Sequence, residues 1–246
     1  PFTEKQIALV ETFANQAVIA IENVRLFNET QRLLKETEDR AAELAVINSV
    51  QEGLASKLEM EAIYDLVGDK IGEVFGAAFV YIALYDRGTN RIEYPYIFDF
   101  QLRQRLSEGP QPMNTGFSPH MIRTKQSLMI NKDFEQQMVE FGSGFFTGQD
   151  PAPEEYPKAF LGAPMIVGQE AVGTVALVSR QENAFSDSDL RLLQTLANSM
   201  SVALENARLW EQEKIYRKAL EREFEIGREI QTGFLPDYLP QPKGWE

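Results

Sequence analysis

Cysteine is absent from this 246-residue sequence, and histidine occurs once, at His120. Without cysteine the chain has no disulfide, thiolate metal ligand, cysteine nucleophile or attachment point for a thioether-linked chromophore. A single histidine without cysteine cannot build a typical zinc site. The carboxylates form no pattern specific enough for acid–base catalysis. We therefore expect neither a catalytic residue nor a metal site in this chain.

Positive charge is also scarce, with 24 Lys and Arg against 37 Asp and Glu and a formal charge of −13. Such a surface repels phosphate backbones and anionic lipid. No uninterrupted apolar run approaches the ~18 residues that span a bilayer, and no basic-then-apolar signal peptide opens the chain. We expect a cytoplasmic protein that binds neither nucleic acid nor a membrane.

One stretch of the sequence occurs twice. Residues 2–30 read FTEKQIALVETFANQAVIAIENVRLFNET, and residues 185–213 read FSDSDLRLLQTLANSMSVALENARLWEQE. A shift of 183 positions aligns the common AN, A, EN and RL letters of the two stretches. A repeat at so long a spacing indicates two copies of one domain in tandem. We expect residues 1–27 to be the closing helix of a preceding domain, and the chain to be part of a longer protein.

Both copies begin with a helix start signal. Ser186 with Asp189, and Thr3 with Gln6, have the spacing of a capping box. Apolar residues then recur at helical spacing in the second copy and predict one buried stripe. These residues are Leu190, Leu193, Leu196, Ala197, Met200, Leu204 and Ala207.

The first helix is expected to continue as a helical linker over residues 28–57. A heptad seam with several polar positions runs along it. The seam is Leu26, Thr30, Leu33, Thr37, Arg40, Leu44, Ile47, Gln51 and Leu54. We favour a parallel two-stranded coiled coil, because a lone exposed helix of this length has little to stabilise it. A single solvated helix between domains is the alternative.

Residues 58–209 then alternate between helix and strand patterns. We expect a helix at 61–75, a hairpin of strands 77–85 and 91–100, a short helix at 117–125, and a strand at 127–131. One or two helical turns at 133–140 and a second hairpin at 160–179 follow. Strict alternation places Ile92, Tyr94, Tyr96, Phe98 and Phe100 on one face, while Pro95 indicates an edge position or a bulge. Adjacent hairpins predict an antiparallel sheet with packed helices, an α+β domain.

Residues 160–209 read FLGAPMIVGQEAVGTVALVSRQENAFSDSDLRLLQTLANSMSVALENARL and resemble the closing hairpin and final helix of a GAF domain, a small-molecule sensor module. The resemblance covers residues 58–209, and residues 2–27 resemble the tail of a preceding GAF domain. It implies a GAF-like central antiparallel β-sheet with flanking helices, here with long N- and C-terminal signalling helices. Helices on one face would form a dimer surface, and loops with a short helix on the other would close a ligand pocket.

The candidate pocket is aromatic, with His120 on the short helix. Its residues are Tyr96, Phe98, Phe100, Phe117, His120, Phe145 and Phe160. The alternative for each residue is that it simply fills the core. His120 could also be a haem ligand or a packed residue at a helix start.

The last residues carry a second resemblance. Residues 220–246 read LEREFEIGREIQTGFLPDYLPQPKGWE and resemble the lead-in to a PPM-type serine/threonine phosphatase of the SpoIIE kind. This implies a signalling helix over residues 210–235 and the start of the phosphatase at 236–246. The aspartates that bind Mn or Mg in that family would lie after Glu246, so this chain would be non-catalytic.

We accordingly expect a regulatory segment in which a small ligand or the upstream domain changes a helical homodimer. Leu209, Tyr216, Leu220, Gly227 and Ile230 would pass that change to the phosphatase. The alternatives are a GAF module that only dimerises, or the sensor of a histidine kinase or nucleotide cyclase.

Overall fold

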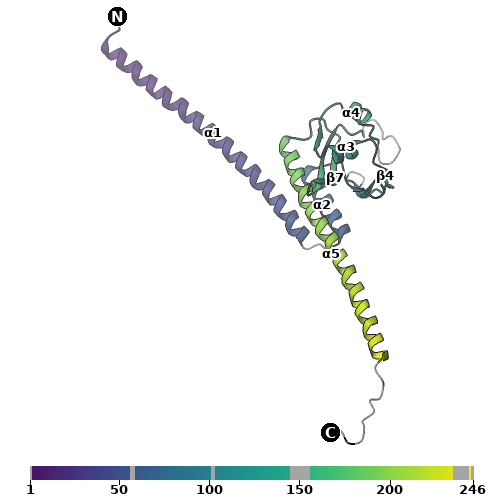
Figure 1. Ribbon diagram of the computed structural model, residues 1–246. Coiled ribbons are helices and arrows are strands. Elements are labelled where there is room, and N and C mark those ends of the chain that lie inside the picture. Colours follow the sequence, from purple (N-terminus) through teal and green to yellow (C-terminus); the bar gives the residue numbers. More distant parts are fainter. Residues whose placement is uncertain (1, 56–58, 101–102, 145–155, 235–243, 245–246) are drawn as a thin grey trace. The chain divides into compact units, whose positions relative to one another are not determined.

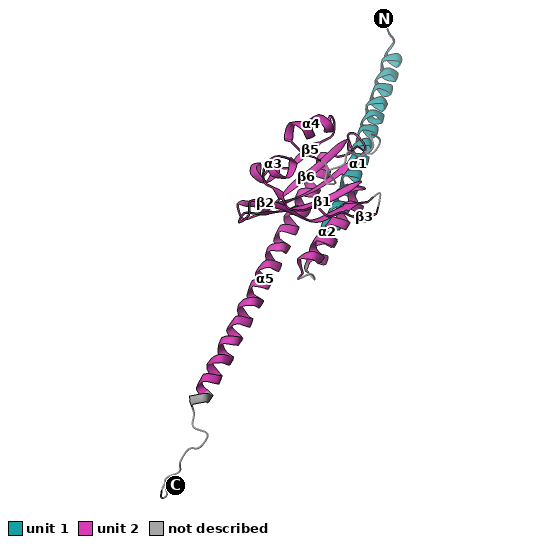
Figure 2. Cartoon of the chain, turned by 90° about the vertical axis from the view of Figure 1, so that its right-hand side faces the viewer, with its two compact units in different colours: residues 1–49 teal, residues 50–246 magenta. Residues whose placement is uncertain are grey.

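The computed structural model describes residues 2–55, 59–100, 103–144, 156–234 and 244. The chain divides into two compact units, Pro1–Ser49 and Val50–Glu246, coloured separately in Figure 2. In the first unit, residues 4–49 are helical. The described part of the second unit holds the sheet, the end of the first helix and four further helices.

Helix α1, Glu4–Ala55, begins at the predicted capping box. The Thr3 amide donates to Gln6 Oε1 at 3.0 Å, and the Gln6 amide donates to Thr3 Oγ1 at 3.4 Å. Exposed Glu–Arg pairs then follow at helical spacing, such as Glu22–Arg25 and Glu29–Arg32. Each such pair adds only ~0.2–0.5 kcal/mol, so these ion pairs alone would not hold a helix of this length.

Helix α1 also contains the most apolar helical stretch among the described residues. An 18-residue window within Glu4–Leu54 has a mean hydropathy of 1.2 and meets the length and composition criterion for a membrane span. The window is not an uninterrupted apolar run, because Glu11, Asn15, Gln16 and Glu22 break it. The indication of a membrane span rests on the length and composition of α1 alone.

The second unit is built on a seven-stranded sheet in the order β3-β2-β1-β7-β6-β5, with β4 also paired to β2. Every pairing in it is antiparallel. The strands are β1 Phe79–Asp86, β2 Arg91–Asp99, β3 Gln104–Arg105, β4 Gln111–Pro112, β5 Leu128–Ile130, β6 Ala159–Val167 and β7 Glu170–Ser179. The predicted α+β fold is confirmed, and both expected hairpins are present.

Helices cover both faces of this sheet (Figures 1 and 2). Helices α2, Met60–Phe75, and α5, Asp187–Phe234, contact each other and one face. Helices α3, Phe117–Thr124, and α4, Phe134–Phe141, lie on the other face, where α3 contacts β6 and β7. The sheet therefore separates two apolar layers.

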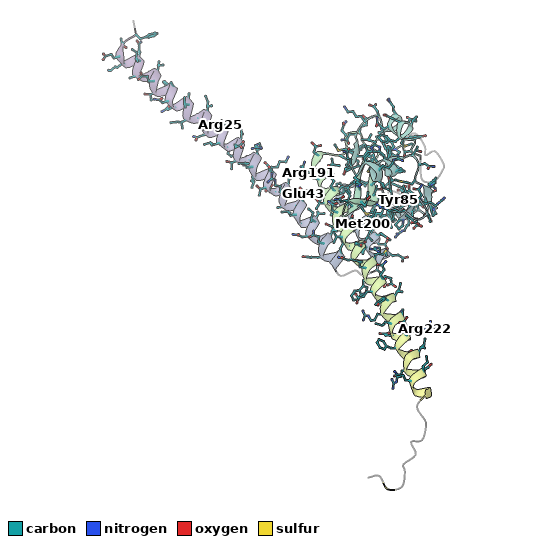
Figure 3. The ribbon with its side chains drawn as sticks, viewed as in Figure 1. Arg25, Glu43, Tyr85, Arg191, Met200 and Arg222 are labelled. Atoms are coloured by element: carbon teal, nitrogen blue, oxygen red, sulfur yellow. The ribbon has the colours of Figure 1, made fainter. Side chains whose placement is uncertain are left out.

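Helix α5 is held on the sheet by its predicted apolar stripe. Leu193, Leu196, Ala197 and Met200 are fully buried, and α5 contacts β6 along this part. The capping box forms as expected, with the Ser186 amide donating to Asp189 Oδ2 at 2.8 Å. Residues 208–231 of the helix are exposed, and Figure 3 shows side chains projecting from the helix around Arg222.

The expected alternation in β2 is wrong, because Pro95 sits in a bulge. Ile82 pairs with Tyr96 but Leu84 pairs with Glu93, so one residue of β1 faces two residues of β2. A bulge with one extra residue reverses the faces of all later side chains. Ile92 and Tyr94 consequently lie on the α3 side, whereas Tyr96 lies on the α2 side.

Tyr96 is clamped where it meets α2. Its hydroxyl donates to Asp69 Oδ1 at 2.6 Å, and the Arg105 guanidinium lies 4.8 Å from the centre of its ring. Arg105 is itself held by Asp65 and by the Pro95 carbonyl. The ring rests directly on Gly68, where a Cβ atom would lie 2.3 Å from Tyr96 Cε1 and Cζ. The absence of a side chain at position 68 thus sets how closely α2 approaches β2.

One further sequence expectation needs correction. Leu54, placed at the end of the exposed heptad seam, is 6% exposed and belongs to the core of the second unit together with Val50. The end of α1 therefore packs, through Val50 and Leu54, in the core of the second unit.

We predict that Gly68→Ala lowers the free energy of unfolding of the domain by about 1–3 kcal/mol, because the clamped Tyr96 ring cannot move away from an added methyl group. Urea unfolding followed by circular dichroism measures this loss. Gly227→Ala is the matched control, since α5 has nothing within 4 Å of that position. Equal unfolding midpoints for the two variants would contradict the clamp.

Candidate functional site

The face of the sheet under α3 and α4 carries the candidate site. Its core combines one face of strands β1, β2, β5, β6 and β7 with the apolar sides of both helices. The buried members are Tyr81, Ala83, Ile92, Ile97, Phe117, Met121, Ile122, Ile130, Phe134, Phe160, Ala171 and Ala176. This layer combines the small residues Ala83 and Ala176 with large aromatic ones.

Helix α3 lies close against β6 because Gly162 has no side chain. A Cβ atom there would lie 2.7 Å from both Cε and Sδ of Met121, closer than real Cβ contacts allow. Arg123 holds the other side of the helix by donating to the Asn114 carbonyl at 2.7 Å. These contacts fix the position of α3 over the centre of the sheet.

An aromatic cluster forms around Phe117, the first residue of α3. Its ring centre lies 4.6 Å from that of Phe160 in β6. It also lies 5.8 Å from Phe134 and 5.5 Å from Phe141, both in α4. His120 meets Phe141 edge-on at 4.7 Å. The cluster ties α3 and α4 to the sheet as one layer.

A small group of hydroxyls lies inside this apolar layer. Thr174 Oγ1 in β7 donates to Ser118 Oγ in α3 at 3.0 Å, and the Tyr81 hydroxyl in β1 lies 3.1 Å from the same Ser118 oxygen. All three residues are at most 5% exposed. Among the described residues, the buried polar side chains are Ser118, Thr174 and Ser201, and no charged side chain is among them. The buried side chains of the site therefore carry no charge, and their polar groups gather at these hydroxyls.

Burial dominates the acid–base behaviour of this layer. It raises the pKa of Tyr81 far above the usual range, with a smaller increase from Tyr94 and an opposing effect of the Ser118 hydrogen bond. Burial, followed by the nearby charge of Glu108, also raises the pKa of Tyr94 to about 12. Both phenols are consequently neutral at physiological pH and act as hydrogen-bonding groups rather than as bases.

Three of the seven candidate pocket residues come together on this face. Phe117 and Phe160 are in direct ring contact, and His120 joins them through Phe141. Phe145 lies outside the described residues. The buried aromatic rings fill much of the layer, in agreement with the alternative that they form core.

Tyr96, Phe98 and Phe100 are not brought to this face. The bulge at Pro95 turns them towards α2, where the Phe100 ring occupies the space beside Gly72. Phe98 lies between the other two rings, with centres 6.3 Å from Tyr96 and 4.7 Å from Phe100. The expectation that all seven residues line one pocket is wrong for these three, which lie on the α2 side of the sheet, Tyr96 buried and the other two partly buried.

The cluster of the Tyr81, Ser118 and Thr174 hydroxyls was not predicted from the sequence. Tyr81 alternates with Phe79 and Ala83 in β1, so its face could have been read from the pattern. Ser118 and Thr174 give no such signal, because a serine in a short helix and a threonine in a strand are both ordinary. Their meeting depends on the register of β1 against β7 and on the position of α3.

Asn131 connects this layer to the start of α5. Its Nδ2 donates to the Phe185 carbonyl at 2.7 Å, and its Oδ1 accepts from the Phe185 amide at 3.1 Å. Its own carbonyl accepts from the Asn183 amide at 2.9 Å. Asn131 stands between β5 and α4, so one side chain joins the α4 side of the domain to the residue before the α5 cap.

Residues 57–205 match the family model for the GAF domain. This chain belongs to the GAF domain family. The matched region contains the sheet, α2, α3, α4 and the buried part of α5. GAF domains are sensor modules of signalling proteins that can bind ligands, and no group of three or more metal-ligating side chains occurs among the described residues.

Solved structures agree with the fold. The GAF domain of an Acinetobacter phosphoenolpyruvate-protein phosphotransferase aligns with a TM-score of 0.56 and 14% identity, covering 68% of this chain and 95% of that domain. The free methionine-R-sulfoxide reductase of Neisseria meningitidis, solved with its substrate, aligns with a TM-score of 0.54 and 14% identity, covering 69% and 92%. At these identities the likeness shows the fold alone.

Curated relatives are longer proteins. The formate hydrogenlyase transcriptional activator FhlA of Escherichia coli is 21% identical over 212 residues, which is 84% of this chain and 30% of that protein. Its counterpart in Salmonella typhimurium is 20% identical over the same length. The chain thus spans about a third of these relatives, and the aligned region is longer than the GAF match itself.

We predict that the stability of the domain is constant from pH 7 to 9 and falls above pH 10. Unfolded tyrosine loses its proton near pH 10, whereas the buried phenols keep theirs, so unfolding releases protons there and is favoured as pH rises. Tyr81→Phe removes one such group and should reduce the slope by about 1.4 kcal/mol per pH unit above pH 10.

Urea unfolding at several pH values measures this slope. Thr174→Val is the control, because it removes a neighbouring hydroxyl that does not titrate and should lower stability by about 1 kcal/mol at every pH. A slope for Tyr81→Phe equal to that of the parent chain would show that Tyr81 is not the buried phenol responsible.

Proposed function

We propose that this chain is the regulatory part of a signalling protein, in which the GAF domain binds a small ligand under α3 and passes its state along α5. The observation that carries the proposal is the continuity of α5 from Asp187 to Phe234. This helix begins two residues after Phe185, which Asn131 holds beside the α4 layer, is buried on the sheet, and then leaves the domain.

The chemistry of the face defines the ligand class. An apolar, aromatic layer with one neutral hydroxyl group suits a small, mostly apolar molecule that carries a hydrogen-bonding group. A phosphate or carboxylate would need a buried cation or several backbone donors, because an unpaired buried charge is costly. Phe117, His120 and Phe160 remain the aromatic residues proposed to contact the ligand.

The helices supply the dimer surface of the proposal. Val202, Leu209 and Trp210 are apolar and exposed on α5, and the repeat places Ile19, Leu26 and Phe27 at the same positions of α1. Matching exposed residues in two copies favour a shared seam for a homodimer through both helices, with residues 28–57 as a coiled-coil linker. Residues 210–235 would be the signalling helix, with Tyr216, Leu220, Gly227 and Ile230 along its seam.

The proposed output is a PPM-type serine/threonine phosphatase beginning at residues 236–246. Support comes from the sequence E-I-x-x-E-I-Q-x-x-F-L-P and the later G-W-E. Mn or Mg would be bound by residues of that domain, and this chain would act on it without catalysing the reaction. The matched relatives are transcriptional activators, so the GAF domain itself does not specify the output. A histidine kinase or nucleotide cyclase stays an alternative.

A cytoplasmic location fits the same proposal. The net charge of −13 disfavours contact with nucleic acid or an anionic membrane surface. The partners proposed are a second copy of the chain, the small ligand and the downstream domain.

A second candidate function is a dimerisation module without a ligand. Its favouring observation is that buried side-chain nitrogen and oxygen atoms of the described residues all have hydrogen-bond partners. The hydroxyls of Tyr81, Ser118 and Thr174 satisfy one another, so this face is complete without a bound molecule.

Native mass spectrometry of the chain purified without denaturation separates the two functions. We predict a dimer that carries a reproducible additional mass, and about fivefold weaker ligand binding in Thr174→Val, since one hydrogen bond contributes about 1 kcal/mol. A bare dimer would favour the dimerisation module. A monomer across micromolar concentrations would contradict relay through a helical dimer.

A further inference from the structure

Helix α1 repeats the buried face of α5, but in α1 that face is exposed. Shifting the sequence by 183 positions aligns the start of α1 with the buried part of α5. Val10, Phe13, Ala14, Ala17, Ile21 and Val24, which we name the closing face of α1, correspond to Leu193, Leu196, Ala197, Met200, Leu204 and Ala207 of α5. Every position of the closing face is apolar.

The exposures of the two sets are opposite. Leu193 and Leu196 are 0% exposed, whereas Val10 and Phe13 are 67% and 62% exposed. Leu204 is 8% exposed and Ile21 is 69% exposed. The α5 residues are buried against β6 and α2, so the structure itself shows what kind of surface this pattern contacts.

We propose that the closing face of α1 packs on the β-sheet of a second GAF core, encoded immediately before Phe2. The capping box is repeated as well, because Thr3 and Gln6 form the same reciprocal bonds as Ser186 and Asp189. Phe2 is exposed, and its counterpart Phe185 is buried where α5 enters the domain. The capping box, the phenylalanine before it and the apolar stripe of α5 are thus all repeated in α1 at the same shift of 183 positions.

Two other occupants fit the closing face less well. A second copy of α1 would contact the seam of Ile19 and Leu26 instead. Because a helix has 3.6 residues per turn, this seam lies on the opposite side of α1 from the closing face. The seam residues are apolar and exposed in both α1 and the matching stretch of α5. A lipid bilayer would have to surround Glu11, Asn15, Gln16 and Glu22, which is costly for any spanning helix. Of these occupants, only a GAF sheet uses the closing face, keeps the seam available for a second copy of the chain and leaves the polar residues in water.

A helix exchange within the full chain tests this. Residues 2–24 replace residues 185–207, so that each closing-face residue occupies its counterpart's place. We expect a cooperative thermal transition no more than about 15 °C below that of the parent, because the buried positions stay apolar while their volumes change. The matched control inserts residues 4–26 instead, which places Thr12, Asn15 and Gln16 at the positions of Leu193, Leu196 and Ala197. This control should lose the cooperative transition, and equal behaviour of the two exchanges would overturn the proposal.

A second pair of variants tests the natural arrangement without relying on the exchanged core. In a chain extended upstream by a segment as long as residues 57–184, Phe13→Asp should abolish one thermal transition and leave that of the present domain in place. Asn15→Asp adds the same charge at a position whose counterpart, Asn198, is exposed, and should change neither transition. An upstream coding sequence without a GAF core would overturn the proposal.

The present chain distinguishes the other occupants. Phe13→Asp should leave its oligomeric state unchanged in analytical ultracentrifugation, and the parent should not sediment with phosphatidylcholine–phosphatidylglycerol vesicles. Conversion of a dimer to a monomer by Phe13→Asp would assign the closing face to a second copy of α1. Vesicle binding that Phe13→Asp abolishes would assign it to lipid. Either result would overturn the proposal.

Discussion

The apolar contact between α5 and the sheet is the interaction on which the other features of the domain depend. Leu193, Leu196 and Met200 are fully buried at that contact, and the same helix continues to Phe234. Because a helix is stiff over this length, its exposed end must follow the orientation that the sheet imposes on its buried end. The helix thus connects the core of the domain directly to the exposed residues beyond Ala207.

The face under α3 and α4 is separated from α5 by the thickness of the sheet, and Asn131 connects the two sides. It leaves β5, precedes α4, and holds the backbone of Phe185 by two hydrogen bonds. Gln194 adds a second link, donating to Ser127 Oγ at 2.9 Å. A displacement of α4 therefore acts at the first turns of α5, whereas the clamp of Tyr96 by Asp69 and Arg105 keeps the far edge of the sheet fixed on α2.

Local rules of the sequence were sufficient for the helices and for five of the seven strands, but not for the two-residue strands β3 and β4 or for the site. Capping boxes, hairpin turns and the stripe of α5 are encoded by neighbouring residues, and each formed where expected. The bulge at Pro95 was anticipated as a possibility, but its consequence was not, because a single extra residue moves Tyr96, Phe98 and Phe100 to the opposite face. The contact of Tyr81, Ser118 and Thr174 joins residues from three separate elements, so only the tertiary fold brings it about.

Amide hydrogen exchange of the Asn131→Ala chain tests most directly whether α4 and α5 are coupled through this one side chain. The account predicts faster exchange together in Phe134–Phe141 and in the first turns of α5. Asn131→Asp should give an intermediate effect, because it can accept from the Phe185 amide but cannot donate to the Phe185 carbonyl. Exchange in α5 at the rate of the parent chain, with only α4 accelerated, would contradict the coupling.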